Sequence, residues 1–179
     1  VMKLSDGAII PANRQLDPFH DKAAWQARID DYYKPYNQAI EQAIDKAQAA
    51  GHVPIILSVH SFTPLWRGQK RPWHAAVLWD KDDRLRNLMV DYMARQKDIC
   101  FGDNAPYSGH LKNDCLYRHG TQKGLPHALI ELRQDEIADA AGQARWAAHM
   151  VDIMKQAENI DQMKEIRHFG SVNDAAETG

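Results

Sequence analysis

Residues 53–64 read VPIILSVHSFTP, and this stretch decides how the rest of the chain is interpreted. The run 53–59 is short, continuously apolar and rich in β-branched residues, which is typical of a strand buried on both faces of a parallel or mixed sheet. The run ends on His60, and a polar turn that contains Pro64 follows it. We therefore predict a buried strand that presents a histidine at its carboxyl end.

Helices and strands alternate on both sides of this strand. Apolar residues recur at spacings of three and four after Asp21, which predicts a helix with a kink or break at Pro35 and a stop at Gly51. Two further strands and two amphipathic helices are predicted in the same way: AAVLW (75–79), HALIELR (127–133), 85–93 and 146–157. This alternation indicates an α/β fold.

The remaining segments are rich in polar, Gly and Pro residues, and they are interpreted as connections: 1–20, 61–74 and 98–126. The segment 98–126 is about as long as a connection becomes without a function or hidden elements of its own. The tail 168–179 is expected to be frayed.

The composition is that of an ordinary globular protein, with 179 residues, 44% hydrophobic and 26% charged. A formal net charge of -2 argues against a nucleic-acid-binding or polybasic membrane surface, and no apolar run approaches the length of a spanning helix. Neither a disulfide framework nor a CxxC metal site fits the two cysteines, and the start VMKLSDGAIIP does not read as a secretory signal. A single domain in the cytoplasm is therefore the expected setting.

Two of the predicted strands carry ionisable residues toward their carboxyl ends, where the sites of open α/β sheets gather. His60 is a suitable metal ligand, because a neutral imidazole binds zinc and a strand holds it rigidly. Glu131 is a suitable general base toward a metal-bound water, and Arg133 shares its face of the strand. Each residue also has a structural alternative, a hydrogen-bonded histidine for His60 and an ion pair for Glu131.

Two of the predicted loops carry residues that suit substrate binding. Arg67 and Arg71 lie four residues apart in PLWRGQKRPWH (64–74), and two guanidinium groups can clamp a carboxylate. The alternative there is a solvated basic loop with tryptophans packed into the core. GDNAPYSG (102–109) offers Asn104 and Tyr107 as donors for a substrate carbonyl, or is a plain series of turns. His119 is a further candidate.

Five stretches taken together resemble the N-formylglutamate amidohydrolase family: SDGAIIPANRQL, YYKPYNQAI, HSFTPLWRGQKRPWH, GDNAPYSG and GLPHALIELRQDEI. The resemblance implies a three-layer αβα fold with a central mixed sheet, similar to zinc carboxypeptidases. It also implies zinc-dependent hydrolysis of the amide of an N-formyl or other N-acyl amino acid, such as N-formyl-L-glutamate, within histidine catabolism.

The resemblance also implies roles for single residues. His60 matches a zinc ligand and Glu131 the general base, while substrate-binding roles fall on Arg67, Arg71, Asn104, Tyr107 and Arg133. The family draws its other zinc ligands from a motif nearer the N-terminus than the segment matched here. We therefore expect one zinc per protomer with its remaining ligands upstream of Val1, so that residues 1–179 form one α/β hydrolase domain lacking its N-terminal strands.

Two alternatives to this function stay open from the sequence. One is a related metal-dependent carboxypeptidase or deacylase that acts on a bulkier N-acyl group. The other is a non-catalytic domain that keeps the carboxylate-binding arginines. In each case the partner is a small molecule rather than nucleic acid or membrane, and the oligomeric state is not indicated.

Overall fold

The computed structural model describes residues 21–177, which fall into two compact units. The first unit ends at Lys46 and the second begins at Ala47. The loop predicted for residues 1–20 lies outside the described residues.

The first unit is helical, and its helix is interrupted where the sequence predicted a break. Helix α2 (Lys22–Arg28) passes into a π-helical turn (Ile29–Tyr33) and then into α3 (Lys34–Ala49). Proline has no N–H to continue the ladder, so the turn before Pro35 widens, and the side chain of Asn37 donates to the Tyr33 carbonyl at 2.8 Å. The predicted stop is confirmed as well, since Gly51 has a left-handed φ of 81° just beyond α3.

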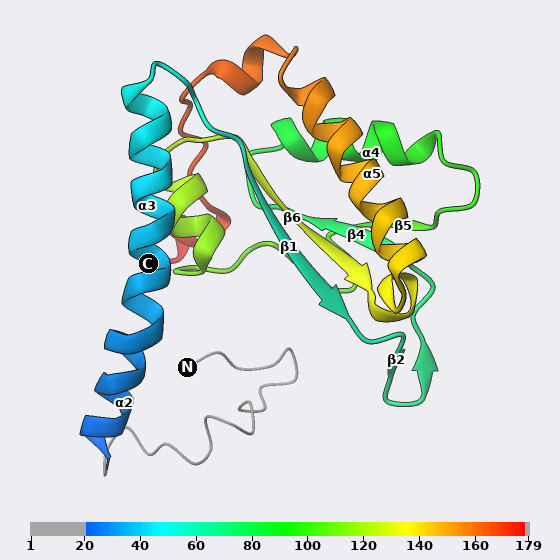
Figure 1. Cartoon of the computed structure of the whole chain (residues 1–179), viewed down its shortest axis with the longest axis horizontal. Coiled ribbons are helices and arrows are strands. Elements are labelled where there is room, and N and C mark those ends of the chain that lie inside the picture. The colour runs from blue at the N-terminus through cyan, green and yellow to red at the C-terminus, as the bar shows by residue number, and fades with distance from the viewer. Residues whose placement is uncertain (1–20, 178–179) are drawn as a thin grey trace. The chain divides into compact units, whose positions relative to one another are not determined.

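The second unit is built on a mixed four-stranded sheet, which confirms the α/β prediction (Figure 1). The strands lie in the order β1 (Ile56–Phe62), β6 (His127–Arg133), β4 (Ala75–Leu78) and β5 (Phe101–Asp103). The pair β1 and β6 is parallel, as is the pair β4 and β5, while β4 runs antiparallel to β6. Because of these directions, the carboxyl ends of β1 and β6 lie at the same end of the strands as the amino end of β4.

The prediction that the first strand ends at His60 is wrong. Strand β1 continues to Phe62, which pairs with Arg133 and is only 3% exposed. Side chains alternate along a strand, so Phe62 lies on the same face as His60. Burial of the Phe62 ring stabilises the strand beyond His60. His60 is therefore held within the strand, between paired residues.

Short elements also lie inside two segments that were interpreted as connections. A hairpin of β2 (Leu65–Trp66) and β3 (Gln69–Lys70) occupies part of 61–74. Its two-residue turn places Arg67 and Gly68 at positive φ, 50° and 78°, as a tight hairpin requires. The segment 98–126 contains β5 and a π-helical turn (Tyr117–Thr121).

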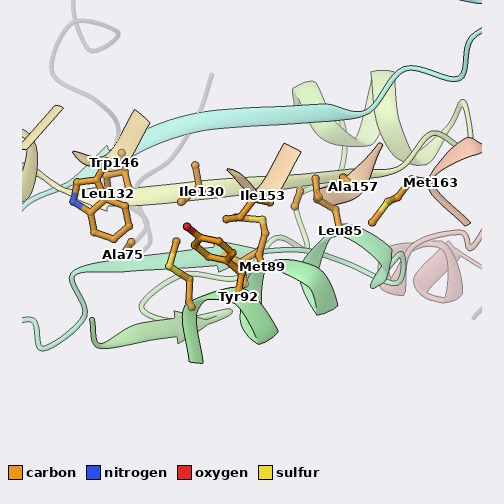
Figure 2. Packing of buried hydrophobic residues seen from close by; sticks show 13 residues of the cluster. Ala75, Leu85, Met89, Tyr92, Ile130, Leu132, Trp146, Ile153, Ala157 and Met163 are labelled. Atoms are coloured by element: carbon orange, nitrogen blue, oxygen red, sulfur yellow. The ribbon is translucent and has the colours of Figure 1, made fainter. Parts of the chain in front are cut away.

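Helices α4 (Arg84–Ala94) and α5 (Ala140–Ala157) cover one face of the sheet, and the main core lies between them and the strands (Figure 2). The sheet contributes alanine and branched aliphatic side chains, and the helices contribute several larger ones, including Trp146 and Tyr92. Buried members of this core include Ala75, Val77, Ile130, Leu132, Leu85, Met89, Tyr92, Trp146 and Ile153. Both helices were predicted from their apolar spacing, and both are confirmed.

The opposite face of the sheet has a smaller apolar cluster. Leu78, Leu116 and Leu129 are buried there, with Ile56 and Tyr107 packed against them. Successive residues of a strand alternate between faces, so Glu131 lies on the same face as Leu129. Because this face has less apolar cover than the helical one, it has room for polar side chains.

The expected fraying of the tail is wrong for residues 168–174. Ser171 is fully buried, and the Val172 N–H donates to the Asp80 carboxylate at 3.1 Å. The Phe169 ring lies 5.1 Å below the guanidinium of Arg84, which is itself buried against Asp82. The described residues also include three short 3-10 segments: Gln134–Ile137, Asp161–Lys164 and Val172–Glu177. In the part of the chain that is described, every helix is too short or too polar to cross a membrane.

Candidate active site

His60 and Glu131 lie side by side, although 71 positions separate them in the sequence. In the register of β1 and β6, His60 is the direct partner of Glu131. Paired residues of adjacent strands lie about 4.8 Å apart and point to the same face. The row continues through Ala76 on β4 and Gly102 on β5. Two small residues therefore follow the histidine and the carboxylate along this row.

Glu131 is a buried carboxyl group on a central strand. The residue is 8% exposed, and its Oε2 atom has no hydrogen-bond partner among the described residues. Burial raises the pKa of the Glu131 carboxyl to about 7, and the positive charge of Arg71 acts in the opposite direction. A carboxyl group with this pKa exchanges its proton near neutral pH, which suits a general base or acid.

Arg71 is held in a cage of aromatic rings beside Glu131. Its guanidinium carbon lies 5.0 Å from the ring centroid of Tyr107, 5.3 Å from that of Trp66 and 5.5 Å from that of Phe62. The residue is 7% exposed, and its Nη1 atom has no hydrogen-bond partner among the residues described. Cation–π contacts stabilise the charge but leave its N–H groups available. A buried donor of this kind is suited to an anionic group of a ligand.

Arg67 contacts the same indole but lies in the exposed turn of the β2–β3 hairpin. Its guanidinium carbon is 5.8 Å from the Trp66 centroid, compared with 5.3 Å for that of Arg71. The hairpin thus brings the two arginines of the predicted clamp to one aromatic ring. Of the two, only Arg71 is buried.

Asn104 holds the loop that carries Tyr107. Its Oδ1 accepts from the backbone N–H groups of Trp79 and Gly109 at 3.0 and 3.1 Å, and its Nδ2 donates to the Trp79 carbonyl at 3.1 Å. Gly109 is required beside it, because a Cβ atom there would lie 2.3 Å from the Trp79 nitrogen. The amide of Asn104 is therefore engaged within the protein, and it fixes the loop that places Tyr107 against Arg71.

Arg133 is likewise engaged within the protein. Its guanidinium binds the carboxylates of Asp135 and Glu136 at 2.6 and 3.0 Å and also donates to backbone carbonyls of the segment 71–73. Glu131 and Arg133 share a face, as predicted from their spacing, but their side chains have different partners. His119, the other histidine considered, is buried in the turn Tyr117–Thr121.

His60 is accessible to a metal ion. The imidazole is exposed, its Nε2 lies 3.1 Å from the Ser58 hydroxyl, and a neutral imidazole is a normal zinc ligand. Within residues 21–177, no group of three or more His, Cys, Asp or Glu side chains could hold a metal ion. His60 therefore fits as one donor, and the described residues do not form a complete site.

Comparisons with known proteins identify the family of the chain. The sequence model of the N-formylglutamate amidohydrolase family matches residues 1–138. The chain belongs to this family. The crystal structure of the gene product Atu2144 from Agrobacterium tumefaciens is similar, with a TM-score of 0.73 and 31% sequence identity over 87% of this chain. The match spans 60% of the Atu2144 chain. No curated protein sequence matches.

Sequence reasoning missed two features of this amidohydrolase family member. The rings of Phe62 and Trp66 complete the cage around Arg71, and the alternation from His60 to Phe62 is a signal that could have found the first of them. Asp114 is the second feature. Burial raises the pKa of its carboxyl, while a hydrogen bond from the Tyr117 N–H and the nearby charges of His127 and His60 lower it. Its position near His60 depends on the fold of the segment 98–126.

Proposed function

We propose that the chain hydrolyses the amide bond of an N-formyl amino acid, such as N-formyl-L-glutamate, to formate and the free amino acid. The observation that supports this most directly is the pairing of Glu131 with His60 under the cage of Arg71. One face thus holds a buried carboxyl oxygen of Glu131 and a buried guanidinium nitrogen of Arg71, neither of which has a hydrogen-bond partner within residues 21–177. An N-acyl amino acid offers a group to each, an amide for the carboxyl and a carboxylate for the guanidinium.

In this proposal Glu131 is the general base and then the general acid. As a carboxylate it takes a proton from the attacking water, and as a carboxylic acid it returns the proton to the departing amine nitrogen. The pKa of about 7 allows both steps near neutral pH. Of the residues that the structure describes, none bonds to Glu131 Oε2 and would compete for the water.

Arg71 is proposed to bind the substrate carboxylate through Nη1. The cage fixes its charge without using this nitrogen, so the charge-assisted hydrogen bond is left for a ligand. Tyr107 orients Arg71 and lines the same side of the site. Arg67, at the exposed turn, is proposed to attract the anionic substrate toward it.

We further propose a zinc ion, with His60 as one ligand and the others outside the described residues. When bound, zinc polarises the amide carbonyl and activates water. We propose that the complete hydrolase domain has the three-layer αβα fold of zinc carboxypeptidases. The proposed reaction belongs to histidine catabolism.

The proposal is tested by formate release from N-formyl-L-glutamate, with and without added zinc, on the full-length chain. N-acetyl-L-glutamate is the matched substrate for a deacylase of broader range. Glu131→Gln is expected to lower kcat by about 10²–10⁴-fold, as loss of a general base does. Glu158→Gln, an exposed residue at the end of α5, is the control.

Two results would favour the alternatives. Faster hydrolysis of N-acetyl-L-glutamate would indicate a deacylase rather than a deformylase. Binding of N-formyl-L-glutamate by both the parent and Glu131→Gln, with no turnover by either at any zinc concentration, would indicate a carboxylate-binding domain.

A further inference from the structure

Arg133 connects the strand of Glu131 to the backbone that carries Arg71. Its Nη1 donates to the carbonyl oxygens of Arg71 and Trp73, each at 3.1 Å, and lies 3.4 Å from that of Pro72. These three consecutive carbonyls lie in the segment between β3 and β4, which has no regular secondary structure. Partly buried carbonyls need a donor, and the two N–H groups of Arg133 Nη1 serve those of Arg71 and Trp73.

The guanidinium of Arg133 is itself locked on its other side. Its Nε donates to Asp135 at 2.6 Å, and its Nη2 donates to Glu136 at 3.0 Å. Glu136 is also bound by Arg145 at 2.5 Å. Two carboxylates therefore orient the planar fork of Arg133, so that its Nη1 faces the carbonyls of the segment 71–73.

The Arg71 backbone has few other constraints. Its N–H donates to the Pro64 carbonyl at 2.9 Å across the base of the hairpin, and Pro72, the next residue, has no N–H to donate. The ladder resumes nearby, where the Arg133 N–H donates to the His74 carbonyl at 2.9 Å. The path of residues 71–73 thus depends on the Arg133 fork, and this path sets where the Arg71 guanidinium enters its cage.

We propose that Arg133 is a positioning residue, which fixes the segment 71–73 and thereby holds the Arg71 guanidinium between Phe62, Trp66 and Tyr107 beside Glu131. Its consequence for substrate binding rests on the proposed function, whereas the positioning itself does not. Since Glu131 and Arg133 are two residues apart on one strand, the strand sets the spacing of the base and the carboxylate-binding group. Lysine cannot replace the fork, because its ammonium is a point donor on a flexible chain.

The test compares Arg133→Lys with Arg145→Ala in the full-length chain. Arg145 forms an ion pair with Glu136, as Arg133 does, but its side chain is exposed. The first readout is the NMR chemical shifts of the Arg71 side-chain protons. These signals are identified by their disappearance in Arg71→Lys. The ring currents of the surrounding aromatic side chains move these chemical shifts away from those of a solvent-exposed arginine. Arg133→Lys is expected to return them toward the solvent-exposed values, and Arg145→Ala to leave them unchanged.

The second readout is steady-state kinetics with N-formyl-L-glutamate. Arg133→Lys is expected to raise KM by about 10-fold or more with a smaller change in kcat. The reason is that a displaced Arg71 no longer binds the substrate carboxylate. Arg145→Ala is expected to change neither. A parent chain that does not hydrolyse this substrate would contradict the proposed function and leave the chemical-shift result to decide the positioning role.

Unchanged Arg71 shifts in a folded Arg133→Lys variant would overturn the proposal, as would an equal change in Arg145→Ala. If Arg133→Lys does not fold, Asp135→Asn replaces it. That variant removes the negative charge that holds the fork at Nε, so a smaller shift of the same protons in the same direction is expected. No shift in Asp135→Asn would then count against the proposal.

Discussion

Glu131 lies directly opposite His60 on the neighbouring parallel strand, and its buried Oε2 atom receives no hydrogen bond from the described part of the chain. Burial favours the protonated form, which is why the pKa of this carboxyl rises to about 7. The same burial that suits a general base therefore costs stability once the group is ionised.

The first prediction is that the parent loses stability relative to Glu131→Gln as the pH rises. The folded pKa of about 7 lies above the ordinary 4.5, so the contribution of the protonated carboxyl is complete below about pH 4.5 and is lost as the pH rises through about 7. Over the whole range the shift corresponds to about 3 kcal/mol of unfolding free energy, of which about 2.5 kcal/mol falls between pH 5 and pH 8. Urea unfolding of both proteins at about pH 5 and about pH 8 measures it. If the difference in unfolding free energy between the parent and Glu131→Gln does not change with pH, this account is contradicted.

The second prediction concerns the charge of Arg71. Because this charge lowers the pKa of Glu131, Arg71→Met should raise that pKa above about 7, while Arg71→Lys should change it less. The pKa can be measured by ¹³C NMR of the Glu131 carboxyl. Arg67→Met is the control, since Arg67 stacks on the same Trp66 but is exposed. An equal rise in Arg67→Met would show that the effect is not specific to the caged guanidinium.

The third prediction separates the structural role of Asn104 from a role in substrate binding. Asn104→Ala removes three side-chain hydrogen bonds and should lower the free energy of unfolding by about 2–3 kcal/mol. Asn113→Ala is the matched control, because Asn113 has the same left-handed backbone, with φ 66° against 48° for Asn104. Among the described residues, the Asn113 side chain makes no hydrogen bond, so thermal unfolding should separate the two variants. Equal destabilisation would mean that backbone strain, rather than the amide, accounts for the effect.

The sequence predicted the main strands and helices because their patterns are local. HALIELR (127–133) matches β6 residue for residue, since the short, mainly apolar run follows the turn residues Gly124 and Pro126. The break before Pro35 also follows from a single residue. The end of β1 was misplaced because Phe62 is kept in the strand by burial and by pairing with Arg133, neither of which is a local property.

The site was predictable in its residue types but not in its contacts. His60 and Glu131 could be named from their strands, whereas their pairing depends on β6 lying next to β1 in the sheet. Arg133 and Asn104 have side chains suited to a ligand, and only the fold shows that both are bonded within the protein. The cage around Arg71 unites residues from β1, β2 and the loop after β5, so no single stretch of sequence contains it.

The last prediction concerns the buried ion pair of Arg84 and Asp82. The Arg84 guanidinium binds Asp82 at 2.6 Å and also donates to the carbonyls of Gly124, Gln162 and Glu165. Arg84→Met should therefore cost about 3–5 kcal/mol of unfolding free energy, because it leaves the Asp82 charge buried without its partner. The double variant Arg84→Met with Asp82→Asn should recover part of this loss, because it no longer leaves a buried charge without a partner.

Arg86→Met is the control for this prediction. Arg86 lies on the same helix and pairs with Asp103, but both side chains are partly exposed, so its loss should cost about 0–1 kcal/mol. Urea unfolding of the three variants and the parent measures the differences. If Arg84→Met is no less stable than Arg86→Met, the buried pair adds no more to the free energy of unfolding than the partly exposed one.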